Sequence, residues 1–251
     1  MRLTVVGCAG SFPGPDSPAS CYLLDADGFR LAIDFGNGAL GGLQKYAGLF
    51  GIDAVVLSHL HADHCVDLYA YAIARTYAPD GPRSPVPVYG PRGTRERIAG
   101  IGGPGDDDGL MDRFSFRTLA PGTLDIGPFR VTAAHVNHPV EAFGFRFDHG
   151  DRSIAYSGDT SPADALVSLA EGADAFVCEA SFLDGPDLPP GLHLTARQAA
   201  EHAQAAGAGQ LMLTHLLAWN DPDASLEEAA GHYDGPLSPA RTGLVVDLKE
   251  D

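Results

Sequence analysis

Ser58-His-Leu-His-Ala-Asp-His64 contains four potential metal ligands within six positions. They are His59, His61, Asp63 and His64. The segment follows the apolar run Asp53-Ala-Val-Val-Leu57, which is typical of a buried strand. A strand that ends in a histidine-rich turn brings imidazoles and a carboxylate to one point, and these ligands suit a divalent ion such as zinc. A solvated polar loop that contains three histidines by chance accounts less well for this density.

Metal-binding side chains also follow three later predicted strands. They are His135 and His138 after residues 129–134, Asp159 after residues 153–156, and His215 after residues 211–213. Gly158 precedes Asp159 and allows the backbone to turn tightly there. Ligands at the ends of separate strands converge only if those ends share one edge of the fold. We predict that they do.

The number of candidate ligands predicts two ions. One zinc ion with an open position takes three protein ligands, whereas the sequence offers about seven. Two ions roughly 3.5–4 Å apart that share a bridging carboxylate use them all. We assign His59, His61 and His138 to one ion, Asp63, His64 and His215 to the other, and Asp159 as the bridge. A hydroxide shared by the ions would be the nucleophile, since coordination lowers the pKa of water to about 7.

The composition is that of an ordinary globular protein, with 251 residues of which 45% are hydrophobic and 20% charged. Acidic residues outnumber basic ones 33 to 16, which gives a formal net charge of −17. A field of this sign repels phosphate backbones unless bound cations reverse it locally. The charge therefore argues against a large nucleic-acid footprint but leaves small phosphorylated substrates open. No signal peptide or membrane-spanning run appears, so we expect a cytoplasmic protein without membrane partners.

The predicted elements indicate stacked sheets with helices outside, as one domain over residues 1–251. Strands are expected at 2–6, 21–25, 29–34, 53–57, 85–89, 114–118, 129–135, 142–148, 152–156, 174–178, 210–213 and 244–248, and helices at 39–49, 65–78, 92–99, 162–170, 195–206 and 223–232. Thr195 and Gly207 are the predicted N-cap and C-terminal stop of the clearest helix. Residues 100–109 are expected to form an exposed loop, because they are rich in glycine and aspartate.

These motifs together resemble the ligand set of the metallo-β-lactamase superfamily. The resemblance rests on His59-Leu-His-Ala-Asp-His64, His138, Ser157-Gly-Asp-Thr160 and His215, which appear in order over nearly the whole chain. It implies an α/β fold, the four-layer αβ/βα sandwich of two mixed β-sheets flanked by helices. Such a ligand set is much more specific for the fold than for the substrate.

Three further segments are similar to the tRNase Z branch, which includes bacterial phosphodiesterases. They are Val140-Glu-Ala-Phe-Gly-Phe-Arg146, Cys178-Glu-Ala180 and His193-Leu-Thr-Ala-Arg-Gln-Ala-Ala200. The first places the ligand at His138, so that His135, the alternative three residues earlier, has a supporting or structural place. The other two imply a proton relay with three members: His193 protonates the leaving oxygen, Glu179 orients His193, and Asp63 is both ligand and acceptor from the bridging water. A carboxylate that ends an apolar strand needs a partner, which agrees with this place for Glu179.

The chain departs from the tRNA-processing members of that branch, which carry a long basic arm. The corresponding segment, Arg92–Asp112, is short and contains the acidic run Asp106–Asp108. A small phosphodiester is therefore favoured over folded tRNA. The opening Val5–Ser20 is similar to that of short bacterial enzymes that hydrolyse 3′,5′-cyclic nucleotides.

We therefore predict a phosphodiesterase with two divalent ions, Zn²⁺ in first place and Mn²⁺ or Fe²⁺ compatible with the same donors. Its expected substrates are small phosphodiesters, foremost 3′,5′-cyclic nucleotides, and the alternative is a tRNA 3′-end processing endoribonuclease. A non-catalytic metal-binding protein and a thiolesterase or lactonase on the same fold are the other classes considered. Relatives in this branch often dimerise, so a homodimer is also expected, without an assigned interface.

Overall fold

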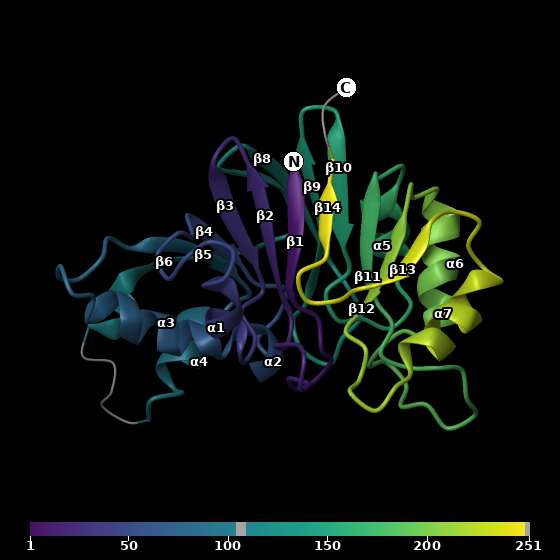
Figure 1. Cartoon of the computed structure of the whole chain (residues 1–251), viewed down its shortest axis with the longest axis horizontal. Helices are drawn as coiled ribbons and strands as arrows, with labels where there is room; N and C mark the ends of the chain where they lie inside the picture. Colours follow the sequence, from purple (N-terminus) through teal and green to yellow (C-terminus); the bar gives the residue numbers. More distant parts are fainter. Residues whose placement is uncertain (104–108, 249–251) are drawn as a thin grey trace.

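Two β-sheets lie face to face, and helices cover the outer face of each (Figure 1). The computed structural model describes residues 1–103 and 109–248. Part of the predicted loop 100–109 therefore lies outside the described residues. The layers follow the order helices, sheet, sheet, helices, which confirms the four-layer α/β sandwich predicted from the sequence.

The first sheet comes from the N-terminal half of the chain together with one C-terminal strand. Its order is β14-β1-β2-β3-β4-β5-β6, with β1 Arg2–Gly7, β2 Cys21–Ala26, β3 Phe29–Ile33, β4 Ala54–Val56, β5 Val86–Gly90, β6 Phe114–Thr118 and β14 Val245–Asp247. The strands β14, β1, β2 and β3 pair antiparallel, and β3 to β6 pair parallel, so the sheet is mixed. Its outer side carries α1 Ala39–Leu43, α3 Asp67–Thr76, α4 Thr94–Ala99 and the 3₁₀ turn Leu110–Arg113.

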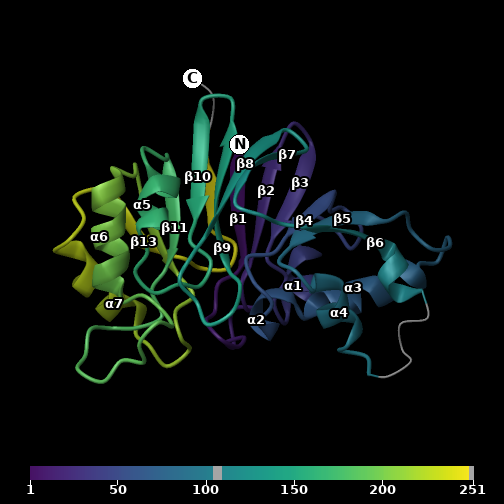
Figure 2. The same cartoon turned by 180° about the vertical axis from the view of Figure 1, so that it is seen from behind.

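The second sheet mirrors the first in its organisation. Its order is β13-β12-β11-β10-β9-β8-β7, with β7 Gly122–Ile126, β8 Phe129–His135, β9 Phe143–His149, β10 Arg152–Tyr156, β11 Ala175–Glu179, β12 Leu211–Thr214 and β13 Leu237–Pro239. The strands β7 to β10 pair antiparallel and β10 to β13 pair parallel. The helices α5 Asp164–Ala170, α6 Ala196–Ala206 and α7 Pro222–Ala230 cover its outer side (Figure 2).

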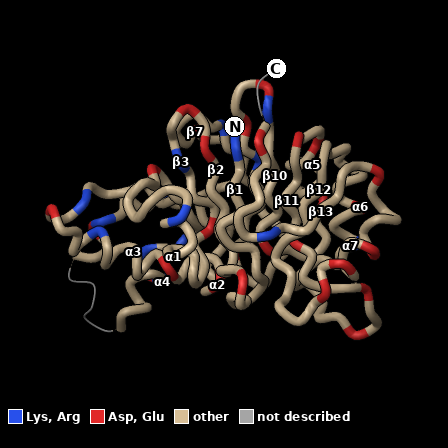
Figure 3. Tube along the Cα trace, viewed as in Figure 1, with Lys and Arg blue, Asp and Glu red and all other residues tan. Residues whose placement is uncertain are grey.

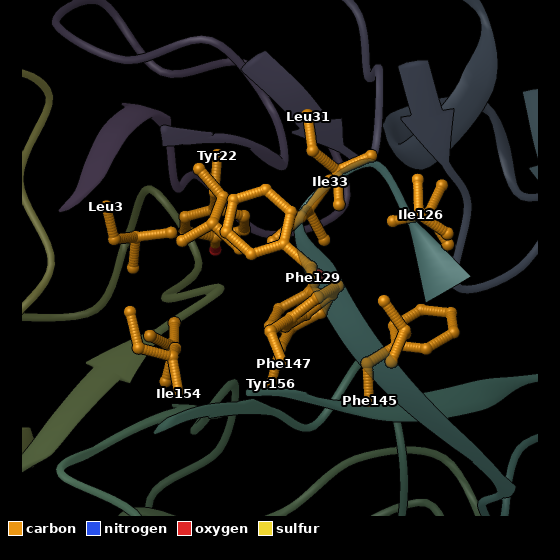
Figure 4. Packing of buried hydrophobic residues seen from close by; sticks show 14 of the residues in the cluster. Leu3, Tyr22, Leu31, Ile33, Ile126, Phe129, Phe145, Phe147, Ile154 and Tyr156 are labelled. Carbon is orange, nitrogen blue, oxygen red and sulfur yellow. The ribbon is translucent and has the colours of Figure 1, made fainter. Parts of the chain in front are cut away.

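Aromatic side chains fill the space between the sheets (Figure 4). Alternate residues of a strand point to the same face, so Phe143, Phe145 and Phe147 of β9 all enter this core. Arg146, between them, points to the helical side and donates to the carbonyl of Leu169 in α5. Burying one such phenyl ring stabilises the fold by roughly 1.5–3 kcal/mol.

The helix α6 is the element that the sequence predicted most completely. The hydroxyl of Thr195 accepts from the backbone N–H of Gln198, whose side chain accepts from the N–H of Thr195, which forms a capping box. Gly207 ends the helix in the left-handed conformation, with φ 60°. The buried face of α6 consists of alanines, so the helix packs closely against β11 and β12.

Several predicted boundaries were wrong for identifiable reasons. The helix expected at 65–78 is two helices, and its first turn, α2 Ala62–Cys65, already contains Asp63 and His64. The helix expected from Pro162 begins at Asp164 instead. Pro162 lies before α5, and its carbonyl accepts a hydrogen bond from the side chain of Asn137. The strands β7 and β13 were not predicted, because the apolar alternation of β7 is limited to Leu124 and Ile126 and β13 has only three residues.

None of the helices among the described residues has the length and hydropathy that a bilayer crossing requires.

Candidate metal centre

The predicted ligands come from segments that leave one edge of the two sheets. Those segments follow β4, β8, β10 and β12, and the short helix α2 lies at the same edge, between the two halves of the molecule (Figures 1 and 2). The two sheets are joined there directly, because the N–H of Phe143 donates to the carbonyl of Ser58 at 2.9 Å. The shared edge brings all seven predicted ligands into two adjacent groups.

The first ligand group consists of His59, His61 and His138. His61 Nδ1 lies 3.1 Å from His59 Nε2 and 3.2 Å from His138 Nε2. Nitrogens that bind one zinc ion tetrahedrally at about 2.0–2.1 Å are roughly 3.3 Å apart. The three imidazoles therefore have the spacing of ligands around one ion.

The second ligand group consists of Asp63, His64, Asp159 and His215, which are all buried. Asp159 Oδ1 lies 3.2 Å from His64 Nε2, and Asp159 Oδ2 lies 3.3 Å from His215 Nε2. Asp159 Oδ2 also lies 3.7 Å from His59 Nε2 of the first group. The carboxylate of Asp159 thus reaches both groups.

Two buried atoms of the second group test whether a cation fits. His64 Nε2 and Asp159 Oδ1 make no hydrogen bond, although they are buried and only 3.2 Å apart. An unsatisfied polar atom in the interior is costly, and such atoms are rare in folded proteins. A divalent ion that accepts lone pairs from both atoms removes this cost, so the donor set fits a metal.

The electrostatics of the first group and of Asp159 favour the protonation states that bind metals, but those of His64 do not. Burial alone lowers the pKa of His64, whereas the carboxylates of Asp159 and Asp34 outweigh burial and raise this pKa well above its usual value, so a cation must displace a proton there. Burial is the largest cause that lowers the pKa of each histidine of the first group, His59 most strongly. For Asp159, burial alone raises the pKa, but the imidazoles of the second group outweigh it and hold the pKa well below its usual value. Neutral imidazole and ionised carboxylate are the ligand forms at pH 7.

A carboxylate that the sequence analysis missed is hydrogen-bonded to His64 on the ring nitrogen that does not face the second ligand group. Asp34 is fully buried just past β3, and its Oδ2 lies 2.7 Å from His64 Nδ1. It also accepts from the N–H of Ser58 at 2.7 Å and from the hydroxyl of Tyr156 at 2.7 Å. A carboxylate on the second ring nitrogen fixes the ring so that Nε2 faces the centre. The sequence did contain a signal for Asp34, because an acidic residue at the end of an apolar strand is the pattern that identified the predicted ligands. Asp34 was missed because the predicted strand 29–34 included it.

Other ligand rings are oriented by oxygen atoms in the same manner. His138 Nδ1 lies 3.0 Å from the carbonyl oxygen of Leu192, and His215 Nδ1 lies 3.1 Å from Ser20 Oγ. His215 itself adopts a left-handed backbone, with φ 57°. A Cβ at Gly10 would lie 2.3 Å from the carbonyl oxygen of His215, so that only glycine allows this close approach.

The pair predicted as a proton relay is also formed beside the ligand groups. Glu179, at the end of β11, is 1% exposed, and its Oε1 lies 2.9 Å from His193 Nδ1. The same carboxylate accepts from the N–H of Thr160 at 2.7 Å and from the hydroxyl of Ser181 at 3.1 Å. The buried charge therefore has its partners. Because a carboxylate accepts, His193 Nδ1 carries the hydrogen, and Nε2 is left for the centre.

His193 stands between the two ligand groups. Its ring centroid lies 5.7 Å from that of His138 and 5.4 Å from that of His215. Burial alone lowers the pKa of His193, but the hydrogen bond and charge of Glu179 outweigh burial, and the pKa is raised. His135, in contrast, stacks on Phe143 with ring centroids 4.6 Å apart and belongs to neither group.

The fold and the ligand groups agree with the comparisons to known proteins. Residues 30–216 match the model of the beta-lactamase superfamily domain. The chain belongs to this family. An uncharacterized protein of Mycobacterium tuberculosis is 43% identical over 242 residues, which is 94% of this chain and 88% of that protein. A ribonuclease Z of Myxococcus xanthus is 27% identical over 305 residues, which is 99% of this chain and 98% of that protein.

A member of the superfamily with a solved structure is also similar along its whole length. The probable metallo-hydrolase YhfI of Bacillus subtilis is 30% identical over 255 residues, which is 98% of this chain and 99% of that protein. Its crystal structure superposes with a TM-score of 0.87 at 29% identity, covering 98% of this chain and 99% of that one. Together with the ligand groups, this places the chain among metal-dependent hydrolases of the superfamily and indicates divalent ions as cofactors.

Proposed function

We propose that the protein hydrolyses phosphodiester bonds of small substrates, 3′,5′-cyclic nucleotides in first place. One observation carries the proposal: the Glu179–His193 pair lies beside the second ligand group, with Asp159 close to both, and Asp159 also reaches His59 of the first group. Phosphodiester cleavage needs charge stabilisation, a nucleophile and an acid for the leaving oxygen. The arrangement has residues for all three requirements.

The seven ligands would hold two divalent ions, Zn²⁺ in first place, in the two groups described above. When bound, such ions lower the pKa of water to about 7 and neutralise charge on the phosphodiester. Manganese or iron would suit the same imidazole and carboxylate donors, because availability often decides among these metals.

His193 is the proposed general acid. Its Nε2 faces the centre because Nδ1 is held by Glu179 at 2.9 Å, so a proton on Nε2 is aimed at the leaving oxygen. Glu179 thereby acts through His193 and positions it. The raised pKa of His193 extends to higher pH the range in which this proton is held.

Asp63 is the proposed proton acceptor as well as a ligand. Its Oδ2 lies 3.4 Å from His64 Nε2 and 3.7 Å from His215 Nε2, and its side chain is 10% exposed. Nearby His64 and His215 lower the pKa of Asp63 more than burial raises it. The carboxylate is thus ionised and open to a water molecule at the second ligand group.

The distribution of charge supports a small substrate. The net charge is −17, and acidic residues are spread over α5, α6, α7 and the loops beside them (Figure 3). In the segment between β5 and β6, α4 lies against the ligand-bearing loop, because Arg97 Nε donates to the carbonyl of Leu60 at 3.1 Å. The shortness of this segment and an acidic surface both disfavour binding of folded tRNA.

The second candidate is tRNA 3′-end processing, which the likeness to a ribonuclease Z favours. It predicts cleavage of precursor tRNA and binding that weakens steeply as salt rises. Cyclic-nucleotide hydrolysis predicts neither.

Incubation of the metal-loaded protein with cyclic AMP, cyclic GMP, bis-p-nitrophenyl phosphate and a precursor tRNA tests both candidates. We expect turnover of the small diesters and none of the tRNA. His193→Ala should lose turnover by about 10²–10⁴-fold and keep its metals, while His232→Ala, an exposed histidine outside the ligand groups, should retain both. Two bound metals without turnover of any small diester would refute the proposal.

A further inference from the structure

Two exposed aromatic side chains form a pair on loops that are far apart in the sequence. The ring centroids of Phe12 and Trp219 lie 5.4 Å apart at an interplanar angle of 42°. Trp219 is 71% exposed and Phe12 is 37% exposed. Apolar ring surface that stays exposed to water has an unfavourable free energy, and a defined exposed pair of this kind indicates a contact surface.

The pair borders the candidate metal centre. The backbone N–H of Ser11, the residue before Phe12, lies 3.3 Å from His215 Nε2, the ring nitrogen of the second ligand group. Consecutive Cα atoms are only 3.8 Å apart, so Phe12 starts next to that group. Trp219 follows His215 by four residues, and the two loops are joined by the hydrogen bond from Gly10 N–H to the carbonyl of Leu216 at 3.0 Å. A substrate phosphate at the ligand groups therefore leaves the rest of a nucleotide within reach of both rings.

Charge around the pair selects which part of a substrate can bind there. Asp16, on the loop of Phe12, and Asp221, two residues after Trp219, are both exposed. They repel a phosphate but not an uncharged aromatic base. Every nucleobase has a π-face, and stacking on aromatic side chains is tolerant of base identity.

We propose that Phe12 and Trp219 bind the base of the nucleotide substrate by stacking, and that this surface gives the enzyme its preference for nucleotides over base-free diesters. The inference rests on the proposed phosphodiesterase function and names the part of the substrate that the metal centre does not touch. An exposed aromatic pair can also be a contact with a second copy of the chain, and the experiments below distinguish that outcome.

Trp219 is the single tryptophan of the chain, so tryptophan emission reports on this surface alone. The metal-loaded protein is titrated with adenosine 5′-monophosphate and, separately, with ribose 5-phosphate, with excitation at the red edge where adenine does not absorb. We expect saturable quenching by the nucleotide and no change with the sugar phosphate. Phe12→Ala should weaken the nucleotide titration about tenfold, since one stacking ring is lost. No quenching by the nucleotide, or equal quenching by both ligands, would overturn the inference.

Kinetics with substituted enzymes supply the second readout. Trp219→Ala should raise KM for cyclic AMP about tenfold with kcat nearly unchanged, and leave turnover of an abasic ribose 3′,5′-cyclic phosphate unaffected. Trp219→Phe keeps an aromatic ring and should recover most of the loss. Tyr77→Ala, which removes a 76% exposed ring at the end of α3, is the matched control and should change nothing. Equal losses on both diesters in Trp219→Ala would contradict a base-binding surface.

The two experiments separate this inference from the function on which it rests. If the wild-type protein hydrolyses neither diester, the proposed function fails, and the fluorescence titration alone decides the inference. Selective quenching by the nucleotide would then still support a base-binding surface. If Trp219 emission instead shifts with protein concentration, in step with dimer formation in sedimentation and without response to the nucleotide, the surface is a dimer contact and the inference is overturned.

Discussion

His64 Nδ1 lies 2.7 Å from Asp34 Oδ2, although His64 belongs to α2 and Asp34 directly follows β3. Both side chains are fully buried. Asp34 also accepts from Ser58 and Tyr156, so hydrogen bonds from the core hold its carboxylate in place beside His64. The orientation of a proposed metal ligand is thus built into the core between the sheets.

Replacement of Asp34 should therefore weaken metal binding, although Asp34 acts only through His64 and is not itself a proposed ligand. Asp34→Asn keeps the shape but removes the negative partner of His64, so we expect metal affinity to fall by about 10–100-fold. Asp34→Ala leaves buried donors unpaired and should lower the free energy of unfolding by about 3–5 kcal/mol. Competition with a chromophoric chelator and urea denaturation measure the two effects. Asp80→Asn, at an exposed aspartate, should change neither, and normal metal affinity in Asp34→Asn would disprove this role.

The ligand groups also predict how many metals each variant retains. The wild-type protein should bind two divalent ions per chain. His138→Ala removes one of three imidazoles from the first group and should reduce the count toward one. His135→Ala is the matched control, since His135 stacks on Phe143 outside both groups and its loss should leave two ions. Elemental analysis after gel filtration gives the counts, and an equal loss in both variants would speak against the assignment.

Removal of the metals should lower thermal stability. Ions that bind only the folded state stabilise it by about 2.7 kcal/mol at a concentration one hundred times Kd. Chelation leaves His64 Nε2 and Asp159 Oδ1 buried without a partner, so we expect the melting temperature to fall by several degrees and to recover on addition of zinc. Scanning calorimetry with and without chelator measures the change, and an unchanged melting temperature would contradict a metal at these atoms.

The pH dependence of turnover should report on the Glu179–His193 pair. Burial alone lowers the pKa of His193, and Glu179 raises it by more, so the net pKa lies above its usual value of about 6.5. A general acid works only while it is protonated, so kcat should fall as the pH rises through this raised pKa. In Glu179→Gln the largest raising cause is gone while burial remains, so the fall in kcat should move to lower pH. A profile that stays in place in Glu179→Gln, with Glu201→Gln as the surface control, would disprove the coupling.

Ligands near strand ends could be predicted from the sequence, because there an apolar run that predicts a strand is followed directly by a metal-binding side chain. His138, Asp159 and His215 each follow an apolar run, and the ends of those runs do meet at one edge. Asp34 obeys the same rule but sits one residue past β3, within the error of any boundary drawn from periodicity. Whether it faces a ligand depends on the register between β3 and β4, which a local pattern does not contain.

The contact between Phe12 and Trp219 could not be predicted from local sequence patterns, for a different reason. Phe12 and Trp219 lie on loops of opposite halves of the chain, and neither belongs to a periodic segment. Their contact follows from the joining of the two loops at Gly10 and Leu216. Loop-to-loop contacts of this kind depend on the whole fold, and only the assembled structure places Ser11, the neighbour of Phe12, beside His215.

The turn before Asp159 offers a test of how tightly the shared ligand is held. Gly158 has φ 59°, and a Cβ there would lie 2.7 Å from the carbonyl oxygen of Phe143 and 3.1 Å from Ser58 Cβ. Gly172 has nearly the same φ, 58°, but nothing lies within 4 Å of its Cβ position. Gly172→Ala should therefore cost only the left-handed backbone penalty, about 1–2 kcal/mol. Gly158→Ala should cost more, because the backbone must also move away from Phe143.

That movement displaces Asp159, the carboxylate that reaches both ligand groups. We therefore expect Gly158→Ala to lose metal affinity as well as stability, whereas Gly172→Ala should lose stability alone. Urea denaturation of the metal-free proteins gives the first quantity, and a metal titration of the folded proteins gives the second. If the two alanine variants lose equal stability and both keep full metal affinity, the backbone at Gly158 does not hold the shared ligand in place. A selective loss of metal in Gly158→Ala would show that the position of Asp159 depends on one contact within the second sheet, between the turn after β10 and the start of β9.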